Sequence, residues 1–378
     1  MRRAGLFVAA SLAFAFGPLV EGGTALANES AIGFGAGASG GCAEPRCVCH
    51  VRSPTQEALA ECLAVPGPGK IVFDKNAPIH IDSPSGGRRA SLKIPSNKTI
   101  SGPVTLISNG TTLEIDGQSN IVIRDVSFRS DLSDHPSCRG IRIPRDASRC
   151  GIPINVIGAS RKIWIDHDDF AECGEKCIEV WAEPNPGQGG GPVPSPDLVT
   201  ISNSRFANSF FGIAIGVNAR TAAADLPEHE RVTLYGNLFD HVFRRTPRVA
   251  SGAWAHVFNN VFRNWGGAGS CVGATKGFGP SATGGGQLLL ENNVFEAWSG
   301  GRSCKLATDI SEYEPAAGES RGPGNVRSTG NLGVNGAEVD SNLGRVFEAS
   351  SLYSYTLLPP ESVLSEVMAN AGARGAAR

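Results

Sequence analysis

Six segments of this chain share one pattern, and that pattern limits the folds the chain can adopt. Each segment alternates apolar and polar residues, continues into a polar turn and ends in phenylalanine, at Phe128, Phe170, Phe206, Phe239, Phe262 and Phe295. The successive spacings are 42, 36, 33, 23 and 33 residues, within the range of periods that marks repeat architectures. The shortest spacing suits one turn of a parallel β-coil, and the longer ones suit the same turn with loops added. The sequence therefore predicts a solenoid of stacked rungs.

A second repeated position favours the same fold. Asparagine stands two residues before the phenylalanine as Asn237, Asn260 and Asn293, and Asn331 follows in a similar context. Asparagine tolerates left-handed turns, and stacked amides at one bend can hydrogen-bond to one another as a ladder. The alternative is an antiparallel β-sandwich, which predicts shorter, more even spacings and hairpin dipeptides that are scarce here. We therefore expect an all-β, parallel β-helix.

Composition and the N-terminus point to an exported β protein. Glycine is 48 of 378 residues, well above the usual ~7 %, and the net charge of −2 indicates neither nucleic-acid nor membrane-surface binding. Two arginines, an apolar stretch and Ala25-Leu26-Ala27 form a secretion signal. We expect cleavage near Ala27 and a secreted monomer, extracellular or periplasmic. The ten cysteines all follow the signal, which favours disulfides of undetermined connectivity.

We expect four segments: a signal peptide (1–27), a leader and Cys-rich N-terminal cap (28–65), the parallel β-helix (66–335) and a C-terminal tail that packs on or trails the coil (336–378). A helix is predicted over 53–65, with Ser53-Pro54 at its start. It would cap the open end of the coil, where uncovered strand edges recruit other chains. Function is expected in the long loops, because loops carry most binding residues; these loops are 129–153, 182–197 and 264–286.

One loop between two repeats is rich in arginine. Residues 243–252 read FRRTPRVASG, with three arginines in five residues around Pro247. Proline fixes its own φ and biases its neighbour to extended conformations. A stiff loop carrying guanidinium groups suits carboxylates or phosphates. The alternative is a solvated basic loop.

Taken in order, these motifs resemble the pectate lyase family of polysaccharide lyases. The resemblance covers roughly residues 66–300 and rests on these segments: the strands of 68–102, WIDH (164–167), LVTISNSRF (198–206), RTPR (245–248) and HVFNNVFRNW (256–265). It implies a right-handed, single-stranded parallel β-helix and export. It also implies cleavage of a pectic or other uronate polysaccharide by β-elimination.

The resemblance also implies roles for individual residues. The elimination removes the proton on C5 of a galacturonate, and Arg245 matches the family's base. Arg248 matches the second basic position of the motif, which holds substrate carboxylates. Arginine is normally protonated, so this role suggests alkaline working conditions. Asp166 and His167 match the WIDH pair, for which we expect a structural role.

A calcium site is implied in the same way. Ca²⁺ would bridge the uronate carboxylate to protein carboxylates and neutralise the charge that develops. The family's carboxylate pair matches Glu175 and Glu179. The alternative is two unrelated surface glutamates. The first calcium aspartate of the family has no counterpart, and Asn155 is the nearest polar residue.

Other positions depart from the family pattern. Ala250 stands where another arginine is expected, and Ser209 and Phe211 stand where the family has histidine and lysine. One alternative is therefore a pectin-lyase-like enzyme on an esterified or other uronate polymer without calcium, with Phe210, Phe211 and Trp254 near an apolar cleft. Another is a catalytically impaired β-helix that binds polysaccharide without cleaving it.

Overall fold

The computed structural model describes residues 30–42, 44–82, 92–131, 133, 150–182, 194–217, 230–266, 277–298, 304, 313–314, 319–320, 323–339 and 342–375. The expected signal peptide lies outside these residues, as do most of the three loops in which function was expected.

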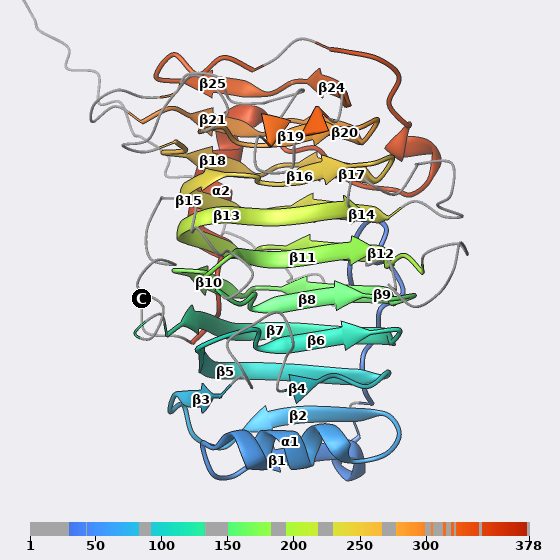
Figure 1. Ribbon diagram of the computed structural model, residues 1–378, viewed down its shortest axis with the longest axis vertical. Coiled ribbons are helices and arrows are strands. Elements are labelled where there is room, and N and C mark those ends of the chain that lie inside the picture. Colours follow the sequence, from blue (N-terminus) through green and yellow to red (C-terminus); the bar gives the residue numbers. More distant parts are fainter. Residues whose placement is uncertain are drawn as a thin grey trace, which may run out of the picture.

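The described chain winds into a coil of parallel strands (Figure 1). Its main sheet contains 23 strands, and successive rungs pair in parallel from β1 to β25. The predicted right-handed parallel β-helix is confirmed, and the antiparallel sandwich is wrong. The one antiparallel strand pair in the described part of the chain is β22 (Tyr313–Glu314) with β23 (Glu319–Ser320), outside the coil.

The coil has three faces, each one strand wide per rung. The first face, which we call the site face, contains the C-terminal half of β13 (Arg205–Val217) together with β4 (Leu92–Lys93), β6 (Leu113–Asp116), β8 (Ile154–Ile157), β11 (Lys176–Ala182), β16 (Arg248–Ala250) and β19 (Ser281–Thr283).

The second face contains the N-terminal parts of β5 (Lys98–Ser108) and β7 (Ser119–Ser130) together with β1 (Val48–Val51), β2 (Gly69–Phe73), β9 (Arg161–Asp166), β12 (Asp197–Ser202), β14 (Arg231–Tyr235), β17 (Trp254–Phe258), β20 (Gln287–Glu291) and β24 (Asn325–Thr329). The third face contains the C-terminal parts of β5 and β7, the N-terminal part of β13, and β3 (Ile79–Ile81), β10 (Asp169–Ala171), β15 (Leu238–Arg244), β18 (Val261–Arg263), β21 (Val294–Glu296) and β25 (Leu332–Val334).

The repeated phenylalanines stack inside the coil behind the third face. Each one is the register partner of the next, and neighbouring ring centroids lie 4.6–5.0 Å apart from Phe128 to Phe295. This distance matches the separation of about 4.8 Å between hydrogen-bonded strands. One aromatic position per rung therefore gives continuous stacking, which explains the periodicity of the sequence.

The predicted asparagine ladder forms at the bend between the second and third faces. The backbone N–H groups of Asn237, Asn260 and Asn293 each donate to the side-chain oxygen of the asparagine one rung on, at 2.8–2.9 Å. The ladder continues toward the N-terminus with other residues: Ser204 N–H donates to Asn237, and Asp168 N–H donates to Ser204 Oγ. The buried backbone N–H groups at this bend therefore each find a hydrogen-bond acceptor on the next rung.

A helix closes the N-terminal end of the coil (Figure 1), as predicted. α1 (Gln56–Ala64) buries Leu59 and Leu63 in the core, and the Cys49–Cys62 disulfide ties it to β1. It begins three residues later than expected because Thr55 is the cap, its hydroxyl accepting from Ala58 N–H. β1 precedes residue 66 and already pairs in the coil.

The expected disulfides are present. Besides Cys49–Cys62, the chain forms Cys42–Cys47 and Cys173–Cys177, and Cys150 and Cys304 are also disulfide-bonded.

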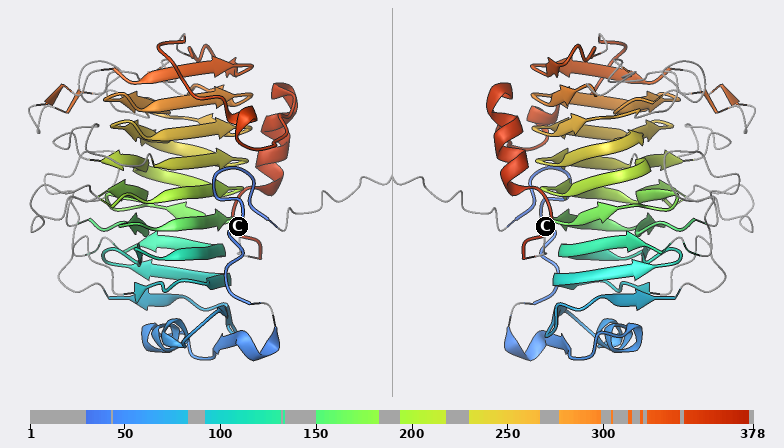
Figure 2. Two further views of the ribbon diagram at one scale, coloured as in Figure 1. Left: turned by 90° about the vertical axis from the view of Figure 1, so that its right-hand side faces the viewer. Right: turned by 90° about the vertical axis from the view of Figure 1, so that its left-hand side faces the viewer.

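Segments from both ends of the chain cover two of the three faces. α2 (Pro360–Asn370) packs Val363 and Val367 on the third face, beside Val261 and Val294. The N-terminal arm (30–42) lies along the second face and contacts the segment before α2, with the Phe34 and Phe347 rings 5.8 Å apart. Figure 2 shows the arm and α2 on one side of the coil. No helix in the described ranges covers the site face, and none is long and apolar enough to cross a membrane.

Candidate functional site

The two arginines predicted for substrate chemistry lie at one corner of the coil. Arg245 follows β15 and has a φ of +65°, an uncommon conformation for a residue with a side chain. Its carbonyl accepts from Ile213 N–H at 2.7 Å, which fixes the corner to the preceding rung. Arg248 is the first residue of β16, on the site face. Both are buried, with 4 % and 3 % of their surface exposed.

An aromatic cluster supports these guanidinium groups. The Cζ of Arg245 lies 4.0 Å from the ring centroid of Phe211, and the Cζ of Arg244 lies 5.2 Å from the same ring. Phe211 packs with Phe210 and Phe243 in a buried cluster. Phe211 therefore positions Arg245 through a cation–π contact, worth about 0.5–2 kcal/mol in general.

The predicted carboxylate pair is bridged by a lysine that the sequence analysis did not single out. Lys176 Nζ lies 2.7 Å from Glu175 Oε1 and 2.7 Å from Glu179 Oε1. All three residues are buried, with at most 5 % exposed. We call Glu175, Lys176 and Glu179 the triad. The glutamates thus share one ammonium ion rather than lying separately on the surface.

The backbone that carries the triad is held in place from three sides. The Cys173–Cys177 disulfide closes a loop around Glu175 and Lys176. A Cβ on Gly174 would lie 1.7 Å from the Cys150 carbonyl oxygen, so this position requires glycine. The hydroxyl oxygen of Ser209, one rung on, accepts from Cys173 N–H at 3.1 Å.

Strand register brings the triad and the arginines onto one face. Glu179 pairs with Ala214, and Ala214 pairs with Arg248, so the two charged residues lie two rungs apart in one column. Two rungs correspond to about 10 Å between Cα atoms. Asn155 pairs with Glu179 on the other side, in the same column. Glu179, Arg248 and Asn155 therefore share one column of the site face, while Glu175 lies just before β11 and Arg245 at the corner just before β16.

The triad does not fit the expected calcium ion. Ca²⁺ takes six to eight oxygen ligands, and the described residues contain no group of three or more His, Cys, Asp or Glu side chains that could hold a metal. One oxygen of each glutamate is hydrogen-bonded to Lys176, whose ammonium would lie against the ion. Like charges at that range repel strongly in a buried site.

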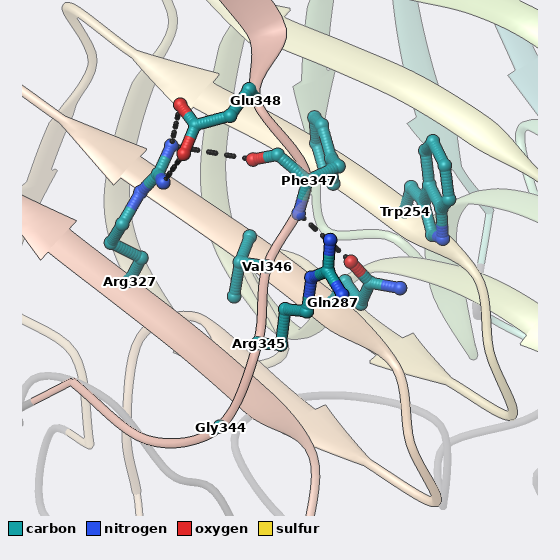
Figure 3. Close-up of a pocket in the computed structure, with 8 residues that line it drawn as sticks. All are labelled: Trp254, Gln287, Arg327, Gly344, Arg345, Val346, Phe347 and Glu348. Atoms are coloured by element: carbon teal, nitrogen blue, oxygen red, sulfur yellow. Dashed lines mark hydrogen bonds and ion pairs between the residues drawn. The ribbon is translucent and has the colours of Figure 1, made fainter.

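Trp254, expected near the cleft, lies elsewhere. It begins β17 on the second face, where its ring stacks on Phe347 with centroids 4.9 Å apart. Figure 3 shows it lining a pocket beside the C-terminal segment, together with Gln287, Arg327 and Glu348, where Arg327 pairs with Glu348. The expectation was wrong because the turn at 251–253 carries the chain onto a different face.

The WIDH pair lies at the ladder bend and not on the site face. His167 Nδ1 and Ser202 Oγ each lie 2.7 Å from an oxygen of Asp166, and Asn203 donates to the same carboxylate. Burial alone would raise the pKa of Asp166, but these hydrogen bonds hold it below its usual value. This closed network supports the expected structural role.

Lys176 and the Cys173–Cys177 disulfide are what sequence reasoning missed. The signal was present in CGEKCIE, where a lysine stands between two glutamates inside a pair of cysteines. The family resemblance drew attention only to the two glutamates. The spacing of these residues does not show that the lysine side chain contacts both carboxylates.

The geometry defines a class of protein: a single-stranded parallel β-helix with a buried, charged site on one face. The pectate lyase sequence profile matches residues 76–376, and this chain belongs to the pectate lyase family. It is 32 % identical to pectate lyase D of Dickeya chrysanthemi over 192 residues, which is 46 % of this chain and 44 % of that enzyme. It is 27 % identical to the pectate trisaccharide-lyase of Thermotoga maritima over 175 residues, 46 % of this chain and 42 % of that enzyme. The matches thus span less than half of these relatives.

Solved structures share the fold over most of the chain. A pectate lyase from Paenibacillus sp. 0602 superposes with a TM-score of 0.64 at 14 % identity, covering 91 % of this chain and 96 % of that one. The cedar pollen allergen Jun a 1 superposes with a TM-score of 0.62 at 18 % identity, covering 91 % and 92 %. At such identities the likeness concerns the fold alone.

Proposed function

We propose that this protein is an exported lyase that cleaves pectate, a galacturonate polymer, by β-elimination, with Arg245 as the base. The observation that carries the proposal is the corner at Arg245. An arginine in an uncommon backbone conformation stands over an aromatic ring, beside a second arginine of the site face.

In the proposed reaction, Arg245 takes the proton from C5 of a galacturonate. The electrons of the C5–H bond form the C4=C5 double bond, and the bond from C4 to the glycosidic oxygen breaks. The leaving oxygen then takes a proton from solvent, which leaves an unsaturated uronide end. A guanidine accepts a proton only in its neutral form, so turnover should increase in alkaline solution.

The other cations would hold the acidic substrate. Arg248 binds a uronate carboxylate through paired N–H donors, which suit the planar carboxylate geometry. It neutralises charge that moves onto the carboxylate when C5 loses its proton. The triad lies two rungs away and would contact a neighbouring sugar of the same polymer.

The test follows the ultraviolet absorbance of unsaturated uronide ends. Purified mature protein is given polygalacturonate or methylated pectin, each with calcium and with chelator. An increase in this absorbance on polygalacturonate supports the proposal, and the Arg245→Ala variant should show no such increase. Arg345→Ala, which removes an exposed arginine in the pocket of Figure 3, is the matched control and should leave turnover unchanged. A folded wild-type protein that gives a flat trace on both polymers would refute the proposal.

A second candidate is the same elimination on an esterified polymer. Lys176 favours this candidate, because its ammonium already neutralises the two glutamates, and an esterified substrate needs no calcium ion between itself and the protein. The aromatic cluster argues against it, since Phe210 and Phe211 are buried and 3–5 % exposed. Faster product formation on methylated pectin than on polygalacturonate would identify this candidate.

A further inference from the structure

The triad fills the position at which the family resemblance predicts a divalent cation. We infer that the ammonium of Lys176 takes the place of that ion, so that the site binds uronate polymers without calcium. The inference rests on the proposed function for its substrate, but its physical basis is the set of contacts made by β11 and the loop before it.

The geometry of Lys176 is that of a fixed internal cation. Its Nζ is 2.7 Å from one oxygen of each glutamate, and its side chain is 6 % exposed. An ammonium has three N–H donors, and the two carboxylates use two of them. The third donor has no protein partner in the described ranges, which leaves it for an acceptor oxygen on a bound sugar.

The surrounding chain keeps the ammonium where it is. The Cys173–Cys177 disulfide, the close packing of Gly174 and the Ser209 hydrogen bond fix the backbone on both sides of Lys176. If calcium displaced the ammonium, a buried cation would lose both of its counter-charges, which is strongly unfavourable. The disulfide-closed loop therefore favours the lysine over an exchangeable ion.

Two further groups suit a sugar at the same place. Glu179 Oε2 and Asn155 Oδ1 are buried and have no hydrogen-bond partner in the part of the chain that the structure describes. They belong to register partners on neighbouring rungs. Both are acceptors, so they suit the hydroxyl groups of a uronate ring, while Lys176 donates to one of its oxygens.

The experiment measures calcium binding without substrate. Thermal unfolding and titration calorimetry are run on the full mature protein with about 10 mM Ca²⁺ or with EDTA. The wild type should show neither saturable heat nor a shift in Tm, because a ligand stabilises a protein only by binding its folded state. Saturable calcium binding by the wild type that Glu179→Gln abolishes would overturn the inference.

A variant tests the cause. Lys176→Met keeps the length of the side chain and removes the ammonium that Glu175 and Glu179 share. This variant should gain calcium binding and a Tm increase of about 1–3 °C in calcium, and the further change Glu179→Gln should remove both. A folded Lys176→Met variant that neither binds calcium nor changes its Tm in calcium would contradict the inference that Lys176 takes the place of the ion.

Because a buried charge change can prevent folding, a second measurement uses the wild type alone. Its affinity for a trigalacturonate is measured by calorimetry in EDTA and in calcium, and the two values should agree within about twofold. Tighter binding only in calcium would refute the inference. Neither binding measurement needs turnover, so a calcium-independent binder that forms no unsaturated product would refute the proposed function and leave this inference standing.

Discussion

The ladder bend and the site face are two buried polar regions built on opposite principles. At the ladder bend the same exchange recurs on each rung: a side-chain oxygen accepts from the backbone one rung earlier, from Val126 to Asn331. On the site face the column through Glu179 and Arg248 has no such repeated exchange: Asn155, Glu179, Ala214 and Arg248 follow one another in register. The triad lies on one rung and Arg248 two rungs further on, and Asn155 and Glu179 keep oxygens without partners in the described residues.

The difference separates stability from function. A satisfied, repeated network stabilises the coil, because each group removed leaves a buried partner unpaired. The buried charges of the site face, which are of mixed sign, contribute little or nothing to stability. Its unpaired acceptor oxygens are available to hydrogen-bond a ligand. Removing a ladder acceptor at the bend should therefore destabilise the protein, and removing a charge on the site face should impair turnover.

The largest effect is expected at Arg245. Replacement by alanine removes the proposed base and should lower turnover by at least about 10³-fold, with nearly unchanged stability. Turnover is measured by unsaturated-end absorbance and stability by thermal unfolding. Turnover within tenfold of wild type, in a folded variant, would disprove the assignment.

Asn260 is the matching test at the bend. Its amide accepts from Asn237 N–H and donates to the carbonyls of Leu234 and Phe258. Replacement by alanine leaves these groups unpaired and should cost about 3 kcal/mol of unfolding free energy, with turnover per folded molecule unchanged. Denaturant unfolding gives the value, with the exposed Asn370→Ala as control. A loss below 0.5 kcal/mol would show that the ladder does not support the coil.

The Cys49–Cys62 and Cys173–Cys177 disulfides allow the contrast between stability and function to be tested with two matched double replacements. Serine replacement of Cys49 and Cys62 should cost about 3 kcal/mol and leave turnover intact, because this bond holds only the cap. The Cys173–Cys177 bond closes a shorter loop, so its replacement should cost only about 2 kcal/mol. It should also lower kcat/KM, since the triad loses its fixed backbone. Equal kcat/KM in both variants would show that the triad does not depend on the disulfide.

Asp168 should give the smallest effect, and one that depends on pH. It occupies a ladder position where later rungs have asparagine, and burial raises its pKa well above the usual value. A raised folded-state pKa means that stability is greatest below the unfolded pKa of about 4 and falls as pH rises toward the folded pKa.

Asp168→Asn should therefore add on the order of 1–2 kcal/mol at pH 8 and almost nothing at pH 4. Urea unfolding at the two pH values measures the difference, with the exposed Asp116→Asn as control. A variant less stable than wild type at pH 8 would show that the carboxylate has an ionic role at the bend.

Periodic features of the fold could be read from the sequence because they are local. Each rung places one phenylalanine and one ladder residue at the same points of the turn, so the spacing of Phe239 and Phe262 and the position of Asn260 already describe the stack and the ladder. The capping helix was predicted from its start signal at Ser53-Pro54; it begins three residues later, because Thr55 is the cap, and it ends one residue earlier.

The site depends on relations between rungs, which a sequence does not display. The sequence, read with the family resemblance, drew attention to Arg245, Arg248, Glu175 and Glu179. Strand register decided that Glu179 and Arg248 share one face, and a turn of three residues decided that Trp254 does not.

What the sequence alone determined is the repeating unit: the periodicity of the coil, its ladder and its cap. Tertiary structure decided the chemistry of the site face. Whether Glu175 and Glu179 turn toward a calcium ion or toward Lys176 depends on side-chain directions within a disulfide-closed loop. That choice is electrostatic and three-dimensional: opposite charges a few residues apart pair only where the backbone brings them within hydrogen-bond distance and burial removes the competing water.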